Sequence, residues 1–295
     1  MARGEKQIND RASAAGLAQE RVTDYFDSQA LYWKEIYERQ DAFSITYQQR
    51  MATVLAWVDG LKLPSGSRIL EIGCGAGFTT IALTHRGLLV EAQDAATAMV
   101  ELTRRHAQDA GVADCVQASV GKVHRLVFPD NTFPLVLAIG VIPWIDAPDV
   151  AVRELARVVQ PGGSLLFTVD NRWRLHYFLN PSRTPLFEPA RWLLQNLRAA
   201  AGLGAGGPLN RQHSIRQTDA FLRAAGLEKT RSKTLGFGPF RFFDIQLFSD
   251  ARGIKLHETL QGWADRGTPL IRSMGGQYLV LARKPQLDQP AAAKY

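Results

Sequence analysis

A short apolar segment followed at once by three closely spaced glycines constrains this chain more than any other stretch. Residues 68–72 read Arg-Ile-Leu-Glu-Ile, which is typical of a buried strand, and Gly73, Gly75 and Gly77 come directly after it. Glycine permits a tight turn, and its missing side chain lets a ligand lie against the backbone. A helix that begins near Phe78 would direct its free N–H groups at that ligand. The pattern predicts a strand, a binding turn and a helix in succession.

The next apolar segment, residues 88–93, ends on an acid, Asp94. Asp94 follows Gly73 by about twenty residues, the separation at which a βαβ nucleotide site places the acid that binds the ribose. The spacing alone leaves the ligand open. A dinucleotide fingerprint has its third glycine one position later, where Phe78 stands, and a P-loop is excluded because no Gly-Lys-Ser/Thr sequence closes the turn.

The chain beyond Asp94 continues to alternate between helical and strand patterns. Helices are expected at 79–85, 95–110 and 150–159, strands at 115–118, 135–139 and 164–169, and a turn at 160–163. The uniformly apolar run at 135–139 is typical of a strand that is buried on both faces. This alternation predicts an α/β fold with a parallel, doubly wound sheet that binds ligands at the carboxyl ends of its strands.

Four motifs, in order and in one register, resemble the class I S-adenosylmethionine-dependent methyltransferases of the small-molecule type. They are Leu70–Gly77, Val90–Asp94 with Met99 and Glu101, Phe128–Phe133, and Arg153–Gly163. The resemblance implies a Rossmann-like sheet of seven mostly parallel strands, in which 228–235 and 277–283 form a last antiparallel pair after a helix at 213–226. It also implies S-adenosyl-L-methionine as the cofactor and S-adenosyl-L-homocysteine as the product.

The same resemblance assigns residues to the cofactor. Glu71 would hold the ammonium group or steer the glycine loop, Asp94 would accept hydrogen bonds from both ribose hydroxyls or cap a helix, and Ile139 would border the methionine portion together with Gly140. The family usually has an Asp that reaches the adenine amine where Ser119 stands, so Ser119 or the backbone of Val120 is expected to bond the adenine. The remaining expected contacts are Gly73, Cys74, Gly75, Gly77 and Ala95.

A catalytic side chain is optional for this chemistry. Methyl transfer from a sulfonium is an in-line displacement at carbon, and alignment of the reactants accounts for about 7–11 kcal/mol of such a barrier. Among six histidines, His176 is the best candidate for a base because it follows the fifth predicted strand, although an ordinary surface histidine is the alternative. The two cysteines, Cys74 and Cys115, form neither a disulfide framework nor a metal set.

The segment Gly140–Trp144 stands where this family's acceptor faces the methyl group. It differs from the Asn/Asp-Pro-Pro-aromatic motif of enzymes that methylate amino groups of nucleic acids, which disfavours a nucleic-acid acceptor. Trp144 is either a platform for the acceptor or a packing residue. The aromatic residues after Arg21 are expected to seal a helix against the core, and the family's N-terminal helix implies that some of them line the cofactor pocket.

The charge is unevenly distributed along the chain. Residues 1–170 hold 16 Lys and Arg against 20 Asp and Glu, or −4, whereas residues 171–295 hold 19 against 8, or +11, which together give the net +7. Residues 173–198 mix aromatic and basic side chains, which suits an anionic acceptor or peripheral contact with a membrane, or a cap with a solvated face. No apolar run reaches the ~20 residues that span a bilayer, and no signal peptide is evident, so we expect a cytoplasmic protein.

We therefore expect an N-terminal tail and helical cover at 1–62 and a cofactor-binding core at 63–170. Residues 171–295 would supply cap insertions after strands five and six together with the last helix and strands. The expected function is methyl transfer to oxygen or nitrogen of a small-molecule or lipid-like acceptor. The alternatives are an RNA or protein methyltransferase and a non-catalytic cofactor-binding protein of the same fold.

Overall fold

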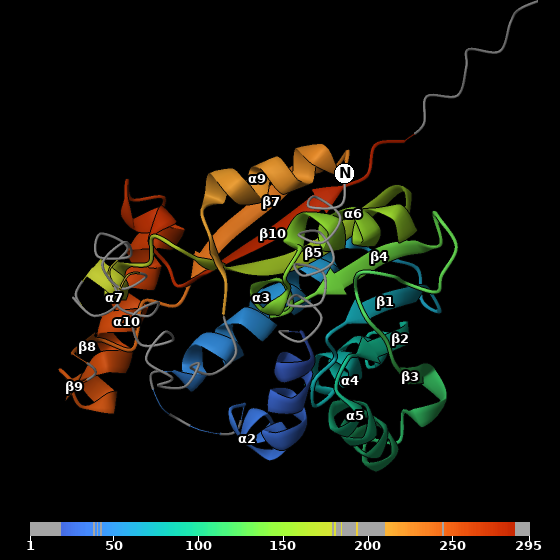
Figure 1. Ribbon diagram of the computed structural model, residues 1–295, viewed down its shortest axis with the longest axis horizontal. Coiled ribbons are helices and arrows are strands. Elements are labelled where there is room, and N and C mark those ends of the chain that lie inside the picture. Colours follow the sequence, from blue (N-terminus) through green and yellow to red (C-terminus); the bar gives the residue numbers. More distant parts are fainter. Residues whose placement is uncertain are drawn as a thin grey trace, which may run out of the picture.

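A single mixed sheet organises the computed structural model, which describes residues 19–37, 39, 41, 43–178, 180, 184, 193, 210–243 and 245–286. Its strand order is β3-β2-β1-β4-β5-β10-β7, parallel from β3 to β5 and antiparallel for β10 against both neighbours (Figure 1). The strands are β1 (Arg68–Ile72), β2 (Leu89–Asp94), β3 (Val116–Val120), β4 (Phe133–Ala138), β5 (Val159–Asn171), β7 (Glu228–Leu235) and β10 (Gln277–Arg283). The doubly wound, mostly parallel sheet expected from the sequence is confirmed.

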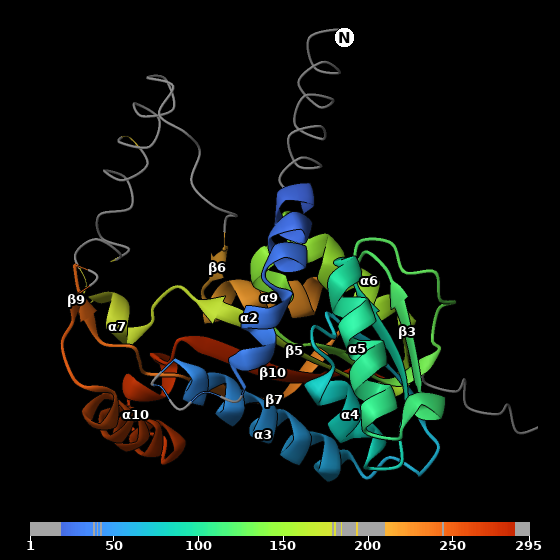
Figure 2. The same cartoon turned by 90° about the horizontal axis from the view of Figure 1, so that it is seen from below.

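Helices cover both faces of this sheet (Figures 1 and 2). Side chains alternate along each strand, so that Leu70 of β1 packs with α6 and α9 while Ile69 packs with α3 and α4. The helices that contribute to the two layers are α3 (Ser44–Leu61), α4 (Phe78–Thr84), α5 (Thr97–Asp109), α6 (Pro148–Val158) and α9 (Ile215–Ala224). The core therefore lies in two apolar layers, one on each side of the sheet.

The expected turn at 160–163 is wrong, because β5 begins at Val159 and continues through these residues. The amide of Gly162 donates to the carbonyl of Lys284 at 2.8 Å, and the amide of Lys284 donates to the carbonyl of Gly163 at 2.9 Å. These bonds extend the antiparallel pairing with β10. A partner more than a hundred residues away in sequence thus holds a Pro-Gly-Gly segment in the sheet.

A short strand that the sequence pattern did not predict, β6 (Gln212–His213), pairs parallel with the end of β5. Within the described parts of the segment after β5 lies α7 (Leu175–Phe178). Phe187 and Trp192, and Arg183, Arg191 and Arg198, which contributed to the expected aromatic and basic cap, lie outside the described residues. The division of the chain into cover, core and cap stays a prediction.

The residues between β7 and β10 form a separate group at the end of the molecule opposite β3 (Figures 1 and 2). They comprise β8 (Arg241–Phe242), β9 (Ile245–Gln246), α10 (Asp250–Asp265) and the 3₁₀ turn η4 (Ile271–Ser273). Phe237 and Phe240 pack with Leu260 of α10 in a small apolar cluster of their own. In the part of the chain that the structure describes, no helix is both long and apolar enough to cross a membrane.

The N-terminal helical cover begins at residue 19, where the described chain starts. Residues 19–28 are helical, and α2 (Ala30–Glu35) and α3 follow. α3 begins at Ser44 and ends at Leu61, inside the helical cover that was expected at 1–62. These helices lie over the carboxyl ends of the parallel strands, where the fold positions its binding pocket (Figure 2).

Candidate functional site

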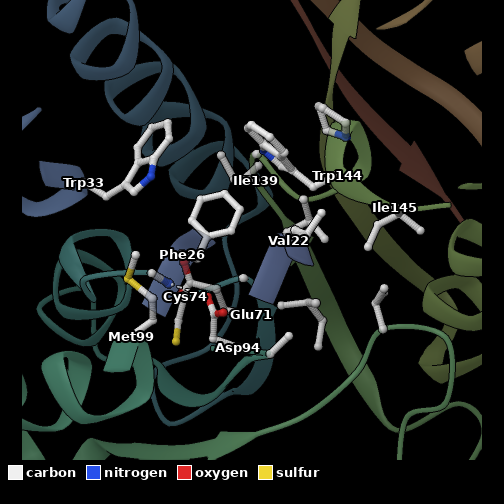
Figure 3. Close-up of a pocket in the computed structure, with 18 of the residues that line it drawn as sticks. Val22, Phe26, Trp33, Glu71, Cys74, Asp94, Met99, Ile139, Trp144 and Ile145 are labelled. Carbon is white, nitrogen blue, oxygen red and sulfur yellow. Dashed lines mark hydrogen bonds between the residues drawn. The ribbon is translucent and has the colours of Figure 1, made fainter. Parts of the chain in front are cut away.

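A pocket opens at the carboxyl ends of β1, β2 and β4, beneath the N-terminal helices. Its walls come from the glycine loop after β1, from the ends of β2 and β4, from residues 121–124 and 139–145, and from aromatic side chains of the cover. Phe26 projects toward the centre of the pocket, between Trp33 and Trp144 on one side and Glu71, Cys74 and Asp94 on the other (Figure 3). The pocket therefore joins elements that are far apart in the sequence.

The glycine loop has the backbone shape that its sequence predicts. Gly73, Gly75 and Gly77 have φ angles of +74°, +55° and +82°, which side chains rarely adopt. A Cβ atom on Gly73 would overlap a methyl group of Val141, whereas the space beside Gly75 is open for 4 Å. The amide of Gly73 donates to the carbonyl of Gln93 at 2.6 Å, which ties the loop to β2.

The carboxylate of Asp94 is hydrogen-bonded to two backbone amides at the edge of the pocket. Oδ2 accepts from the amide of Gly75 and Oδ1 from the amide of Ala96, both at 3.0 Å. Burial raises the pKa of Asp94 despite these bonds. Asp94 thus fixes the loop and the start of α5 from within the pocket wall, and its bonds to ribose hydroxyls stay a prediction.

Glu71 and Cys74 are buried on either side of the first glycine, and both line the pocket. Oε2 of Glu71 accepts a hydrogen bond from the hydroxyl of Thr80 at 2.6 Å. Burial, aided by the charge of Asp94, raises the pKa of Glu71 to about 7. Burial also raises the pKa of the Cys74 thiol well above its ordinary value, so Cys74 stays protonated at neutral pH.

Arg50 of α3 is the main pocket residue that the sequence analysis missed. It is 6% exposed, and its guanidinium lies over the ring of Tyr47 at 4.6 Å. Nη2 donates to the hydroxyl of Tyr37 at 3.2 Å and Nη1 to Oε1 of Gln277 at 3.5 Å. Among the described residues, Nε has no hydrogen-bond partner and the guanidinium forms no ion pair. No local sequence signal marks Arg50, because only the packing of α3 on the sheet brings its charge here.

Aromatic residues of the N-terminal cover contact Trp144 at the mouth of the pocket. The ring of Phe26 meets Trp144 edge to face at 5.2 Å between centroids, and Tyr25 stacks on Trp144 at 6.0 Å. Phe26 also lies 5.6 Å from Trp33. Trp144 therefore packs against the cover and also lines the pocket, while its role as a platform for the acceptor stays a prediction.

Seven of the ten residues expected at the cofactor line this pocket, and three do not. The seven are Glu71, Gly73, Cys74, Gly75, Asp94, Ala95 and Ile139. Gly77 instead stands at the N-cap of α4, and a Cβ atom there would lie 3.1 Å from Thr103.

Ser119 and Val120, which are expected at the adenine, do not line this pocket, and their contact with the cofactor stays a prediction. Ser119 Oγ accepts from Nε2 of Gln93 at 3.3 Å, and Val120 is 55% exposed. β3 ends at Val120, and the amide of Gly121 donates to the carbonyl of Asp94 at 2.9 Å, so residues 121–124 line the pocket in their place.

His176 does not line this pocket either. It lies in α7, next to Gly276, and lines a second pocket on the other side of the Asp170–Arg174 ion pair. Its role as a base stays a prediction.

Comparison with known proteins identifies a methyltransferase domain in this chain. Residues 70–167 match the family model described as a methyltransferase domain. The chain is 31% identical over 118 residues to the ubiquinone biosynthesis O-methyltransferase of Paracidovorax citrulli (strain AAC00-1), covering 40% of this chain and 50% of that protein. It is 30% identical over 141 residues to the malonyl-[acyl-carrier protein] O-methyltransferase of Halorhodospira halophila, covering 47% and 46%. The matches thus span about half the length of these relatives.

The fold has a solved counterpart in the magnesium protoporphyrin IX methyltransferase of Synechocystis PCC 6803, crystallised with bound S-adenosylhomocysteine. The TM-score is 0.57 at 18% sequence identity, over 89% of this chain and 98% of that one. Together with the domain match, this likeness shows that residues 70–167 form a methyltransferase domain and that the chain has the Rossmann-like fold of such enzymes.

Proposed function

We propose that this chain transfers the methyl group of S-adenosylmethionine to an oxygen or nitrogen atom of a small-molecule or lipid-like acceptor. The observation that carries the proposal is the charge arrangement in the pocket. The buried carboxyl groups of Glu71 and Asp94 lie on the glycine-loop side, and the buried guanidinium of Arg50 lies beside Gly140. This set suits a molecule with a zwitterionic end and a ribose.

The residues present fit S-adenosylmethionine group by group. An acid is needed for the ammonium group, and Glu71 supplies one. A cation is needed for the carboxylate, and Arg50 has an Nε with no hydrogen-bond partner among the described residues. Asp94 stands at the end of β2, where this fold binds a ribose, and the open side of Gly75 leaves room for a ligand to pass over the backbone.

The bound cofactor supplies a methyl group on a positively charged sulfur, which is activated for in-line displacement. The work of this chain is to bind, align and exclude water. Glu71, Asp94 and Arg50 would hold the donor, and the aromatic residues Phe26, Trp33 and Trp144 would cover the acceptor and keep water out. Alignment of this kind accounts for about 7–11 kcal/mol of a displacement barrier.

Two features support the choice of acceptor. The two relatives described above are named O-methyltransferases, which favours oxygen as the methylated atom. The aromatic lining of the pocket favours an apolar or planar small molecule over a protein or RNA chain. Peripheral membrane contact stays a prediction, which co-sedimentation with anionic liposomes at low salt would check.

The proposal is tested first by binding and then by turnover. Calorimetric titration with S-adenosylhomocysteine should show binding to the wild type and a loss of about tenfold or more in Arg50→Gln, because a charged hydrogen bond to a carboxylate is lost. The exposed Arg105→Gln is the matched control. Labelled methyl groups should then pass to members of a panel of phenols and carboxylic acids. Failure of the wild type to bind S-adenosylhomocysteine would refute the proposal.

A further inference from the structure

The hairpin of β8 and β9 exposes more large apolar side chains than any other segment of its length in the described residues. Five of them lie within residues 242–248, and they are Phe242, Phe243, Ile245, Leu247 and Phe248, which are 46%, 58%, 71%, 48% and 40% exposed. Single exposed apolar residues are normal on a protein surface, whereas a group of them marks a site of interaction. The hairpin is therefore a candidate contact surface.

The base of this hairpin is fixed to the apolar cluster around α10. Phe240, which precedes β8, is buried in that cluster, and its ring lies 6.0 Å from the ring of Phe248. The amide of Leu247 donates to the carbonyl of Phe240 at 3.1 Å. Nε2 of Gln246 donates to Oδ1 of Asp250 at the start of α10 at 2.9 Å. These contacts hold the hairpin in place, so that its exposed side chains are presented from a fixed support.

A second pair of exposed aromatic side chains lies at the same end of the molecule. α7 and the hairpin both border the second pocket, and both are drawn at the end opposite β3 (Figures 1 and 2). Trp173 and Phe178 are 44% and 38% exposed, and their rings stack at 6.0 Å between centroids. Exposed apolar side chains thus gather at one end of the fold.

The charges around the hairpin favour an anionic partner. Among the described residues between β7 and β10, five basic side chains form no ion pair, against two acidic ones, Asp250 and Glu258. The five are Arg241, Arg252, Lys255, Arg266 and Arg272. The hairpin also belongs to the half of the chain, residues 171–295, that carries +11. Unpaired positive charge next to an apolar surface attracts a partner that is both negative and apolar.

The shape of the hairpin favours a lipid surface over a protein. β8 and β9 have two residues each, which is too short for a partner to add a strand to their edge. A specific protein interface buries about 800 Å² on each partner and needs a surface of matching shape. Lipid chains, in contrast, deform around a narrow apolar tip. Aromatic and aliphatic side chains beside basic ones suit the boundary between the headgroups and the acyl chains of an anionic bilayer.

We propose that the β8–β9 hairpin is a peripheral membrane contact, which inserts apolar side chains such as Phe243 and Ile245 between the headgroups of anionic lipids. The basic residues Arg241, Arg252 and Lys255 attract the phosphates of the same lipids. This contact is a property of the surface, so it goes beyond methyl transfer and does not depend on the acceptor. It lies at residues 241–255, outside the aromatic and basic segment 173–198 on which the sequence analysis based a membrane contact.

The test is co-sedimentation of the full chain with vesicles of phosphatidylcholine, alone or mixed with phosphatidylglycerol. The wild type should bind the anionic vesicles more tightly, and added salt should weaken that binding. The double variant Phe243→Ser/Ile245→Ser should bind about tenfold more weakly, because two apolar side chains no longer enter the bilayer. Lys255→Gln should lose about fivefold on anionic vesicles. Val127→Ser, which is 84% exposed in the wild type and lies between β3 and β4, is the matched control and should bind as the wild type does.

Two results would overturn the inference: the wild type binds neither kind of vesicle, or both the double variant and Lys255→Gln bind as tightly as Val127→Ser. In the first case, a dimer in sedimentation velocity that the double variant lacks would show that the hairpin joins two copies of this chain instead. Each variant should bind S-adenosylhomocysteine as the wild type does, because none of the changed residues lines the cofactor pocket, and this titration also shows that the variants fold. If that titration succeeds and vesicle binding is absent, the membrane contact is wrong while the proposed function stands.

Discussion

At the scale of single residues, the buried carboxyl group of Glu71 links pH to stability. Its pKa of about 7 in the folded protein lies above the ordinary value of 4.5, so the folded state binds the proton more tightly than the unfolded state between these values. Stability should therefore fall as the pH rises from about 4.5 to about 7. Above about pH 7 the carboxyl group is ionised in the folded protein, and the loss of stability caused by its burial is complete.

Replacement of this residue removes the effect. Glu71→Gln should gain stability relative to the wild type on going from pH 5 to pH 8, by on the order of 1–3 kcal/mol. Urea unfolding at the two pH values measures it, with the exposed Asp109→Asn as control. Equal differences between wild type and Glu71→Gln at both pH values would contradict the assigned burial effect.

The same carboxyl group should couple cofactor binding to pH. An ammonium group held beside Glu71 favours the carboxylate, so binding releases a proton wherever Glu71 is protonated in the free protein. The affinity of the wild type for S-adenosylhomocysteine should rise with pH up to about 7 and then level off. Calorimetric titrations across this range should show an affinity of Glu71→Gln for S-adenosylhomocysteine that does not change with pH. If the affinities of both proteins change with pH to the same extent, Glu71 does not bind the ammonium group.

At the scale of elements, two constraints act on Gly73 in the turn between β1 and α4: its positive φ angle and the lack of room for a side chain. Gly66, which precedes β1, is subject to the first constraint alone. Gly73 and Gly66 both have positive φ angles, +74° and +80°, but only Gly73 would place a Cβ atom against a neighbour, Val141. Gly66→Ala should cost about 1 kcal/mol of stability from the backbone alone, and Gly73→Ala clearly more. Thermal unfolding measures the loss of stability in the two variants. Equal losses would show that the contact with Val141 adds nothing to the cost of Gly73→Ala.

A buried histidine joins the insert between β7 and β10 to the helical cover. Nδ1 of His257 accepts from the amide of Phe237 at 3.2 Å, so Nε2 carries the proton and donates to Oε1 of Gln49 of α3 at 2.7 Å. Burial lowers the pKa of His257 to about 4. The neutral ring thus holds α10 and α3 together.

This contact predicts a loss of stability in acid. Because the folded pKa lies below the ordinary 6.5, its stabilisation is complete above pH 6.5 and is lost as the pH falls toward 4. His257→Gln should lack this component, which is on the order of 1–3 kcal/mol. Urea unfolding at pH 7 and pH 4.5 measures the loss of stability in acid, with the exposed His85→Gln as control. If His257→Gln loses as much stability in acid as the wild type does, the loss does not come from His257.

At the scale of the whole molecule, the pocket beside the glycine loop is lined by segments that are far apart in the sequence. Arg50 in α3 and Gln277 in β10 are 227 residues apart and contact each other at its wall. A ligand there should stabilise the entire fold: S-adenosylhomocysteine at a hundred times its Kd adds about 2.7 kcal/mol. Thermal unfolding with and without ligand measures this, and Arg50→Gln should show a clearly smaller shift at the same ligand concentration.

The strands were the most predictable part of this fold. The bounds of β1 agree with the apolar segment read from the sequence, because an apolar strand that runs into turn residues is a local pattern. The bounds of β7 and β10 agree with the antiparallel pair that the family resemblance implies. β6 and the start of β5 escaped prediction, since a distant backbone partner, and no local propensity, makes them strands. Ser119 and Val120 do not line the pocket for a similar reason, because the pocket wall depends on where the chain turns after β3.

The sequence by itself determined the glycine-loop side of the pocket, because a glycine loop with positive φ angles and an acid at the end of the next strand lie within about twenty-five consecutive residues. Only the tertiary structure decided how the rest of the pocket is lined. Arg50, Trp144 and Asp170 come from separate elements. Burial and charge pairing depend on which elements pack together, and that information is not carried by any short stretch of chain.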